Sequence, residues 1–337
     1  MIKATTSGRT HVRTSIAVLA GIALTVSGCG GDNSAASDED PAAAGGNGSV
    51  APTAPLTGLP VEGAAPDKPV MVVKVDNTSS AQPQVGLDSA DLVVEELVEG
   101  GMTRLAAFYH SDYPAEVGPV RSMRDSDVGI VSPTGGKLVA SGGAPGTQQR
   151  LAEAGLDVLS EGSAGFSRDP ARTAPYDLMI DLAAAADRQP AADAPDDYLP
   201  FGDAKLKNGD PVKSFGVTFS STSTTRWEPQ GDGWVRANAP VVPKGDLVAD
   251  NVLVLSVEVG DAGYLDPGGN PVPETKFTGK GKAQLFSDGK VYSGTWSKDS
   301  LDGNLTLETR KGDELTVPAG KTFIELVPRD GGSVRLR

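Results

Sequence analysis

Residues 137–162, KLVASGGAPGTQQRLAEAGLDVLSEG, contain the pattern that decides the fold of the first half of the chain. A short apolar run is followed by a Gly-rich turn, a stretch with helical periodicity and a second strand-like run. Strand, turn, helix and strand in this order are typical of a βαβ unit, whose two strands are parallel. The sequence therefore predicts a sheet with parallel strands in this region.

Neighbouring stretches extend this sheet. PVMVVKVDN at 69–77 has the composition of a buried strand, and DLVVEELVEGGMTRLAAFYH at 91–110 predicts two strands around a Gly-Gly turn. APYDLMIDLAAAADR at 174–188 predicts a helix that starts near Pro175. Residues 55–200 are therefore expected to form an α/β domain with a mixed sheet.

The second half, residues 201–337, is predicted to be an all-β domain. It contains short β-rich runs separated by turn residues such as Asp288 and Gly289, a spacing that suggests a sandwich or a small barrel. The composition also changes near residue 201, because all three tryptophans lie beyond it and lysine replaces arginine as the commoner basic residue. The expected fold class is α+β in two domains.

The N-terminus predicts the compartment. Three basic residues precede the apolar run 16–26, and VSGC ends at Cys29, which is the single cysteine of the chain. This is the pattern of a secretory signal, and the run is too short to span a bilayer stably. The VSGC ending resembles a bacterial lipobox, which implies a signal peptide at 1–28, lipidation of Cys29 with fatty acid such as palmitate, and a flexible tether at 29–54. The expected location is the extracytoplasmic face of the cell membrane.

Charge and composition exclude several function classes. The 337-residue chain has a formal charge of −14, and removal of 1–28 deletes three positive and no negative charges, which gives −17. A nucleic-acid partner is therefore not expected. His110 is the one histidine left after processing and no free thiol remains, so cysteine nucleophiles, disulfides and zinc sites of the Cys or two-His type are excluded. No metal or cofactor is expected.

Four arginines form a candidate anion site. GPVRSMRDSD at 118–127 places Arg121 and Arg124 near the start of a short predicted helix, within one turn of each other. FSRDPARTAP at 166–175 adds Arg168 and Arg172 on a Pro-rich loop. Paired guanidinium groups can bind a phosphate, a sulfate or a carboxylate bidentately. The alternative is that these arginines pair with nearby acids and hold loops in place, and the sequence leaves both possibilities open.

The acids of the 91–110 hairpin are the second candidate group. If Gly100 and Gly101 form a two-residue turn, Arg104 lies beside Glu95 and Glu99 on one face of the hairpin. Glu96 then lies on the apolar face, where it either pairs with an arginine or is available to bind a ligand.

Two polar residues follow the strand at 69–77. Asp76 and Asn77 stand at its carboxyl end, a position that suits an acid, a metal ligand or a turn, of which the turn is the commonest use. We therefore take Glu96 and Asp76 as the candidate catalytic residues, and we add Asn77 to the four arginines as candidate ligand-binding residues.

Several motifs occur in the order found in a known family. They are PLTGLP, VDN, AQPQVGLDSADLVVEELVEGGMTR, GPVRSMR, SRDPARTAPYDL, KGKAQLFSDGKVYSGTWSK and VPAGKTFIELVP. With these motifs the chain resembles the YerB-like family of bacterial lipoproteins from residue 55 to residue 328. The resemblance implies an N-terminal and a C-terminal domain, both of unknown function, and it implies no catalytic residues.

Together these features predict a membrane-anchored binding or interaction module of the cell envelope. Its arginines would bind an anionic component of the cell wall, and its lipid on Cys29 would hold it at the membrane. The alternative is an enzyme that uses Glu96 or Asp76 as acid or base on an anionic envelope polymer.

Overall fold

The computed structural model describes residues 52–61, 63, 66–202, 206–239 and 246–337. The predicted signal peptide, Cys29 and the tether up to residue 51 lie outside the described residues. Within the described residues, none of the helices combines the length and the apolar character needed to cross a bilayer.

The first half of the chain contributes five neighbouring strands to a large mixed sheet. In spatial order these are β2 (Leu92–Leu97), β3 (Thr103–Tyr109), β1 (Met71–Asp76), β4 (Lys137–Ala140) and β5 (Asp157–Ser160). β3 is antiparallel to both of its neighbours, whereas β1, β4 and β5 are parallel. Helix α2 (Pro145–Glu153) connects β4 to β5, and this confirms the predicted βαβ unit.

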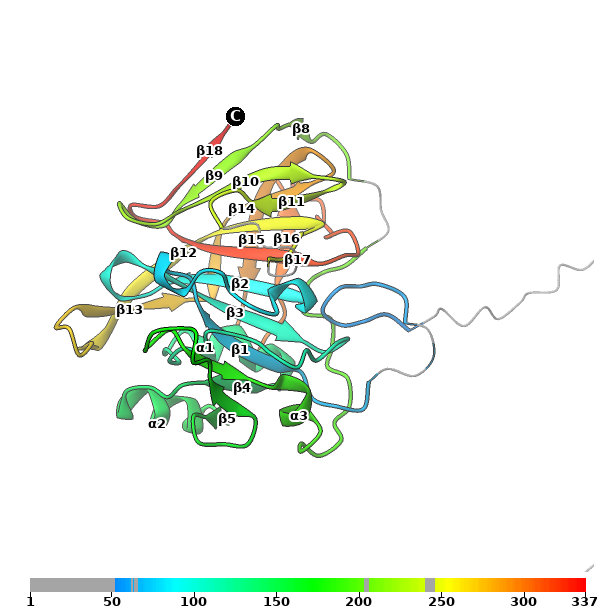
Figure 1. The fold of residues 1–337 in the computed structure, drawn as a ribbon. Helices are drawn as coiled ribbons and strands as arrows, with labels where there is room; N and C mark the ends of the chain where they lie inside the picture. Colours follow the sequence, from blue (N-terminus) through cyan, green and yellow to red (C-terminus); the bar gives the residue numbers. More distant parts are fainter. Residues whose placement is uncertain (1–51, 62, 64–65, 203–205, 240–245) are drawn as a thin grey trace, which may run out of the picture. The chain divides into compact units, whose positions relative to one another are not determined.

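The second half continues the same sheet. β17 (Thr322–Pro328) lies between β2 and β12 (Asn251–Leu265) and is parallel to both (Figure 1). The remaining strands are β14 (Gly279–Ser287), β15 (Lys290–Lys298) and β16 (Thr306–Thr309), with β13 (Pro271–Lys276) paired to β12 and β8 (Asp210–Pro211) paired to β15. The two halves of the chain therefore share one sheet, and the overall class is α+β.

A four-stranded antiparallel sheet packs against one face of the large sheet. Its order is β11 (Gly233–Arg236), β10 (Thr224–Gln230), β9 (Phe215–Thr218) and β18 (Ser333–Leu336). Phe215 stacks on Phe286 with ring centroids 3.6 Å apart, and Trp227 meets Phe323 edge-on at 4.9 Å. The long strands of the second half belong to the shared sheet. An independent sandwich or barrel in the second half is therefore not confirmed and stays a prediction.

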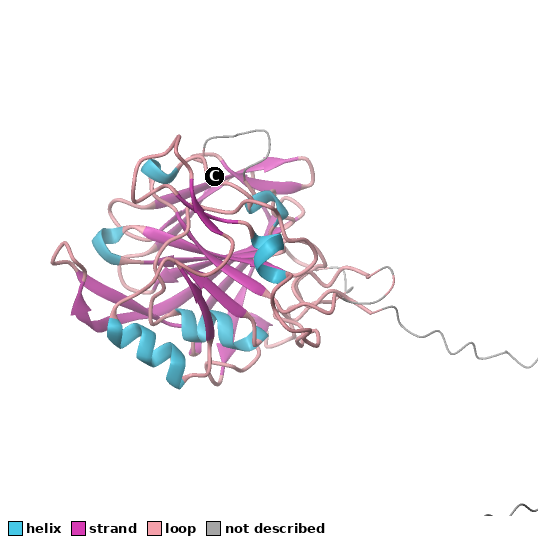
Figure 2. Cartoon of the chain, turned by 60° about the horizontal axis from the view of Figure 1, so that its bottom comes forward, coloured by secondary structure: helices cyan, strands magenta, loops and turns pink. Residues whose placement is uncertain are grey.

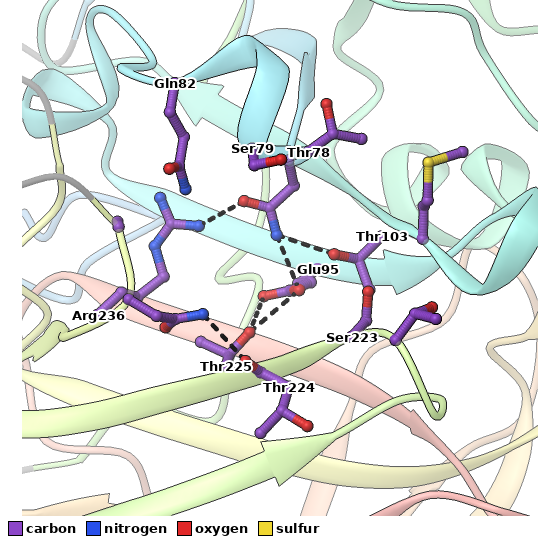
Figure 3. Close-up of a pocket in the computed structure, with 14 residues that line it drawn as sticks. Thr78, Ser79, Gln82, Glu95, Thr103, Ser223, Thr224, Thr225 and Arg236 are labelled. Carbon is purple, nitrogen blue, oxygen red and sulfur yellow. Dashed lines mark hydrogen bonds between the residues drawn. The ribbon is translucent and has the colours of Figure 1, made fainter.

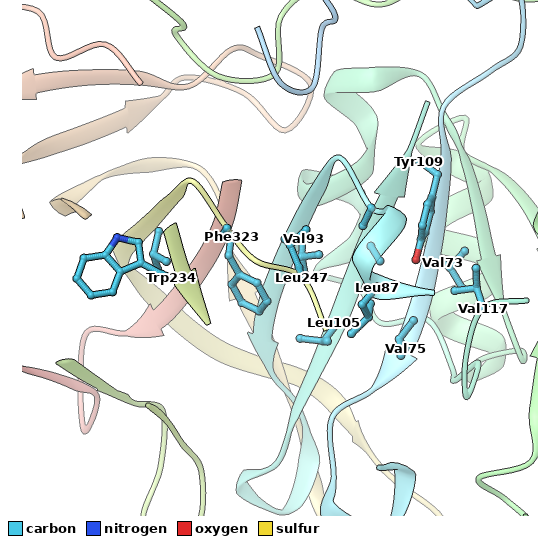
Figure 4. Close-up of a cluster of buried hydrophobic side chains, with 14 of the residues drawn as sticks. Val73, Val75, Leu87, Val93, Leu105, Tyr109, Val117, Trp234, Leu247 and Phe323 are labelled. Carbon is cyan, nitrogen blue, oxygen red and sulfur yellow. The ribbon is translucent and has the colours of Figure 1, made fainter. Parts of the chain in front are cut away.

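The large sheet is buried on both faces. One core contains the aromatic contacts above and continues through Val93 and Val73 to helix α3 (Leu182–Ala186) (Figure 4). The other core lies under α1 (Asp127–Val131) and α2. The short helices lie outside the strands (Figure 2). Burial on both faces explains why β1 and β2 each begin with three consecutive apolar residues, 71–73 and 92–94.

The predicted helix at 174–188 is wrong over its first part. Leu178–Ile180 form strand β7, which pairs with β6 (Phe166–Arg168), and α3 begins only at Leu182. The Asp181 carboxylate accepts a hydrogen bond of 2.9 Å from the backbone N–H of Ala184, as an N-cap does. The apolar spacing that suggested a longer helix instead reflects a strand that is buried throughout.

The predicted register of the 91–110 hairpin is wrong by one residue. A 3-10 turn at Glu99–Gly101 makes the loop longer than two residues, so Leu97 faces Thr103 and Glu96 faces Arg104. As a result Glu96 and Arg104 share one face of the sheet, and Glu95 points to the other.

Candidate binding pocket

A pocket of about 350 Å³ lies between the carboxyl ends of β1 and β2 and the start of β10. Its walls come from the segment after β1, from β2 and β3, and from the residues around β10 and β11 (Figure 3). We call it the Glu95 pocket. Ten of its fourteen lining residues carry a hydroxyl or an amide: Asn77, Thr78, Ser79, Gln82, Thr103, Thr222, Ser223, Thr224, Thr225 and Asn238.

Glu95 stands at the inner end of this pocket, between Thr103 and Thr225 (Figure 3). Its carboxylate accepts a hydrogen bond of 2.9 Å from Asn77 Nδ2 and one of 3.1 Å from Thr225 Oγ1. Asn77 Nδ2 also donates to Thr103 Oγ1 at 2.8 Å. The pocket floor is therefore a preformed network in which side chains from three strands and one turn fix the position of Glu95.

Arg236 is the one cation among the described residues of the pocket lining, and its charge is already matched. Nε and Nη2 bind Asp246 at 3.0 and 2.7 Å, while Nη1 donates to Asn77 Oδ1 at 2.7 Å. Although burial favours the neutral form, the neighbouring Asp246 holds the pKa of Arg236 above its ordinary value. The guanidinium thus orients Asn77 and has little capacity left for a second anion.

A second carboxyl group lies directly behind Glu95. Glu325 in β17 is the register partner of Glu95 in β2, so both side chains lie on the same face, and Trp227 Nε1 donates to Glu325 Oε1 at 2.6 Å. Burial raises the pKa of Glu95, and burial together with the charge of Glu95 raises the pKa of Glu325 well above its usual range. The pair therefore favours a protonated Glu325 behind an ionised Glu95 that accepts hydrogen bonds.

The other face of the sheet holds Glu96, a predicted catalytic candidate. Lys74 Nζ lies 2.6 Å from Glu96 Oε1 and 2.7 Å from Asp127 Oδ1, and all three side chains have no exposed surface. We call these three residues the Lys74 cluster. Burial and the charge of Asp127 raise the pKa of Glu96, while Lys74 opposes this shift. Glu96 is therefore paired with a lysine, where the sequence suggested an arginine or a ligand, and it does not line the Glu95 pocket.

Asp76 and Arg121 form an ion pair at the end of β1. Asp76 Oδ2 lies 2.9 Å from Arg121 Nε, and Asp76 Oδ1 accepts a hydrogen bond of 2.7 Å from the backbone N–H of Thr78. The Arg121 guanidinium also lies 5.5 Å from the ring centre of Tyr176. Asp76 thus acts as a turn-forming and charge-pairing residue in this structure.

The remaining predicted arginines also have carboxylate partners. Arg124 binds Glu99 through two nitrogens. Burial, together with the positive charge of Arg124, lowers the pKa of the neighbouring Arg104 to about 10. Arg168 lies 2.6 Å from Asp177 and 2.5 Å from Glu161. Arg172 lies 3.2 Å from Asp169 and donates to two backbone carbonyls. The anion site that the sequence suggested at these residues stays a prediction.

Of the residues that the sequence singled out, Asn77 lines the Glu95 pocket. Glu95 was expected to be a hairpin partner of Arg104, and its role in the pocket was missed because the register was wrong by one. Glu325 was missed because it meets Glu95 through the pairing of β17 with β2. Thr225 and Arg236 were missed because they reach Glu95 and Asn77 from the second sheet packed against the first. The sequence has no local signal for contacts between such distant parts of the chain.

Two family models match this chain. Residues 56–194 match the model described as "Protein of unknown function (DUF3048) N-terminal domain", and residues 215–324 match the corresponding "C-terminal domain". The chain therefore belongs to this two-part family, the YerB-like family that its motifs resemble.

YerB of Bacillus subtilis illustrates the family in both sequence and structure. The chain is 27% identical over 290 residues to "Putative lipoprotein YerB" of strain 168, covering 82% of this chain and 86% of that protein. It also superposes on the crystal structure of YerB protein with a TM-score of 0.70 at 24% identity, covering 84% of this chain and 99% of the other. The structural likeness shows that the fold is shared.

Proposed function

We propose that this protein is a lipid-anchored binding module on the extracytoplasmic face of the membrane, and that the Glu95 pocket is its ligand site. The observation that carries the proposal is the pocket lining, in which ten of fourteen residues carry a hydroxyl or an amide. Such side chains both donate and accept hydrogen bonds, as the hydroxyl groups of a sugar or polyol require. The pocket volume of about 350 Å³ lies in the range that small ligands occupy.

The proposed anchor rests on the N-terminal sequence. VSGC ends at Cys29 after an apolar run, and the Bacillus subtilis relative is named as a lipoprotein. In this proposal residues 1–28 are removed, lipid on Cys29 enters the membrane, and the small and polar residues 30–54 act as a tether. The boundary near residue 201 is retained as a proposed division between the two family domains.

Binding is favoured over hydrolysis by the number of carboxyl groups. Glu95 is the only acid among the lining residues that the structure describes, and Glu325 lies behind it in the next strand. Most glycoside hydrolases need two carboxyl groups that flank the scissile bond. The lining therefore supports recognition of a polyhydroxylated ligand.

A carboxylate-dependent enzyme acting on an envelope polymer is the second candidate. It is favoured by the raised pKa of Glu95, which places a group able to exchange a proton inside the pocket. In this version Glu95 takes the role that the sequence suggested for Glu96 or Asp76. An anion site at Arg121, Arg124, Arg168 and Arg172 would require a ligand that displaces their carboxylate partners.

A matched pair of double variants tests the proposed pocket. Ser79 and Ser223 line it, and their hydroxyls make no hydrogen bond to another described residue, whereas Ser80 and Ser221 are their exposed neighbours outside the lining. Binding of glycerol, ribitol and N-acetylglucosamine oligomers to the purified full chain is measured by calorimetry. We expect S79A/S223A to bind about tenfold more weakly, because two hydrogen bonds are lost, and S80A/S221A to bind as the wild type does. Equal binding by both variants, or no binding to the wild type, contradicts the proposal.

A further inference from the structure

A second pocket, of about 250 Å³, lies on the outer face of the four-stranded sheet. Three arginines, Arg226 in β10, Arg335 in β18 and Arg337 after it, contribute to its lining. We call it the arginine groove. Arg226 and Arg335 are both register partners of Gly216 in the strand between them, so the three residues form one row across the sheet. With strands about 4.8 Å apart, the two arginine Cα atoms stand about 10 Å apart, and Gly216 leaves the space between them open.

The three guanidinium groups of this groove are unpaired in the described part of the chain. None of them makes a side-chain hydrogen bond or an ion pair there, whereas Arg121, Arg124, Arg168, Arg172 and Arg236 each bind a carboxylate. Glu228 is the one acid among the described residues of the lining, so the charged side chains of the groove sum to about +2 in a chain whose formal charge is −14. Unpaired arginines gathered at one hollow of an acidic protein indicate an anionic ligand.

The arginine groove and the Glu95 pocket share one lining residue, Thr224. The alternation along β10 places Thr224 and Arg226 on the outer face while Thr225 points inward to Glu95. Asn238 fixes this junction, because it donates to the Thr224 carbonyl and accepts from the Arg226 N–H, both at 3.0 Å. A ligand longer than one sugar or polyol unit that passes around Thr224 can therefore contact both sites.

We propose that the ligand is an anionic polyhydroxylated polymer, with a sugar or polyol unit in the Glu95 pocket and a phosphate or carboxylate group over Arg226 and Arg335. This inference rests on the proposed function and specifies its ligand class. The anionic group of the ligand binds in the arginine groove and not at Arg236, because Asp246 already binds that guanidinium. Guanidinium groups on rigid strands suit both candidate anions, since each can accept two parallel N–H bonds.

Charge-matched variants of the full chain test this inference. R226A/R335A removes two positive charges from the groove, and R310A/K311A removes two from an exposed turn elsewhere, where neither residue forms an ion pair within the described residues. A third variant, Gly216→Val, fills the space between the arginines without changing the charge. The nearest atom to a Cβ at Gly216 is 3.8 Å away, so the fold accommodates the side chain.

The measurement is the affinity for glycerol phosphate oligomers and oligogalacturonate, compared with a neutral N-acetylglucosamine oligomer, at low and high salt. We expect the wild type to bind at least one anionic oligomer tenfold or more tightly than the neutral one, with an advantage that falls as salt rises. R226A/R335A and Gly216→Val should lose this advantage, by about 10- to 100-fold, and R310A/K311A should keep it. Comparison of the glycerol phosphate oligomers with oligogalacturonate identifies whether a phosphate or a carboxylate is bound.

The outcomes separate the two proposals. Equal affinity for anionic and neutral oligomers in the wild type, or equal affinities of R226A/R335A and R310A/K311A, overturns the anionic ligand and leaves the polyol pocket standing. Anionic binding that depends on Arg226 and Arg335 but not on Ser79 and Ser223 supports the arginine groove and removes the polyol pocket. Arginine-dependent binding to phosphatidylglycerol vesicles without binding to either oligomer overturns the polymer, because the anion is then a lipid headgroup.

Discussion

Replacement of Glu325 by glutamine should stabilise the protein at neutral pH. Glu325 and Glu95 are buried register partners, and the nearby cation Arg236 is held by Asp246. Glutamine keeps the acceptor for Trp227 Nε1 and offers an N–H to the Glu95 carboxylate, but it carries no charge. The substitution thus removes the second acid from the pair while the packing is preserved.

The size of the effect follows from proton binding. The pKa of Glu325 in the folded chain lies well above the ordinary value of 4.5, so the folded state binds this proton more tightly than the unfolded state. The associated stability is present below pH 4.5 and is lost as the pH rises towards the folded pKa, by about 1.4 kcal/mol for each pH unit. Relative to the wild type, Glu325→Gln should therefore gain stability as the pH rises from 4.5, up to about 3 kcal/mol by pH 7, and gain little near pH 4.5.

Thermal unfolding followed at several pH values between about 4.5 and 7.5 measures this gain. A difference of 3 kcal/mol corresponds to a rise in Tm of about 5 to 10 °C for a chain of this size. Glu228→Gln is the control, because Glu228 is exposed on the four-stranded sheet and should show no such pH-dependent difference. A Tm that falls equally at all pH values in Glu325→Gln would refute the protonated Glu325 beside an ionised Glu95, and would show that Glu325 is stabilising as a carboxylate.

Three further substitutions test the packing and pairing of buried residues, each by urea unfolding at neutral pH. Lys74→Met leaves two buried carboxylates without a cation and should cost about 3 to 5 kcal/mol, and an unchanged midpoint would contradict the Lys74 cluster. Arg124→Ala removes both hydrogen bonds to Glu99 and should cost about 1 to 3 kcal/mol, whereas a more stable variant would show that the pair is a strained site. Phe215→Ala removes the ring stacked on Phe286 and should cost about 3 to 5 kcal/mol, and a loss below 1 kcal/mol would mean that the two sheets are loosely packed.

Local sequence patterns predicted many individual strands and turns. The buried strand at Met71–Asp76, the βαβ unit around α2 and the Asp288-Gly289 turn follow directly from composition and turn chemistry. The turn is an example: Asp288 and Gly289 both have positive φ, as a two-residue hairpin of type I′ requires. These elements depend on residues that are close together in the sequence.

The errors occur where distant residues decide the structure. Leu178–Ile180 have an apolar spacing that also suits a helix, but pairing with Phe166–Arg168 fixes them as a strand. The hairpin register depended on a 3-10 turn that the Gly-Gly pair alone does not specify. The Glu95 pocket was harder to predict than the strands, because Glu95 and Glu325 meet only when β2 and β17 pair.

The position of β17 makes the central pairing of the large sheet depend on residues far from β2 in the sequence. This strand comes from residues 322–328, yet it fills the place between β2 and β12 and bonds to both. Until these residues leave the ribosome, β2 has an unpaired edge, which is the kind of surface that associates with other strands. A shortened chain that lacks β17 would lose the Glu325 carboxyl and the central pairing of the sheet together. The Glu95 pocket is thus completed only after β17 has been synthesised, so a chain that stops before residue 322 cannot form the Glu95–Glu325 pair.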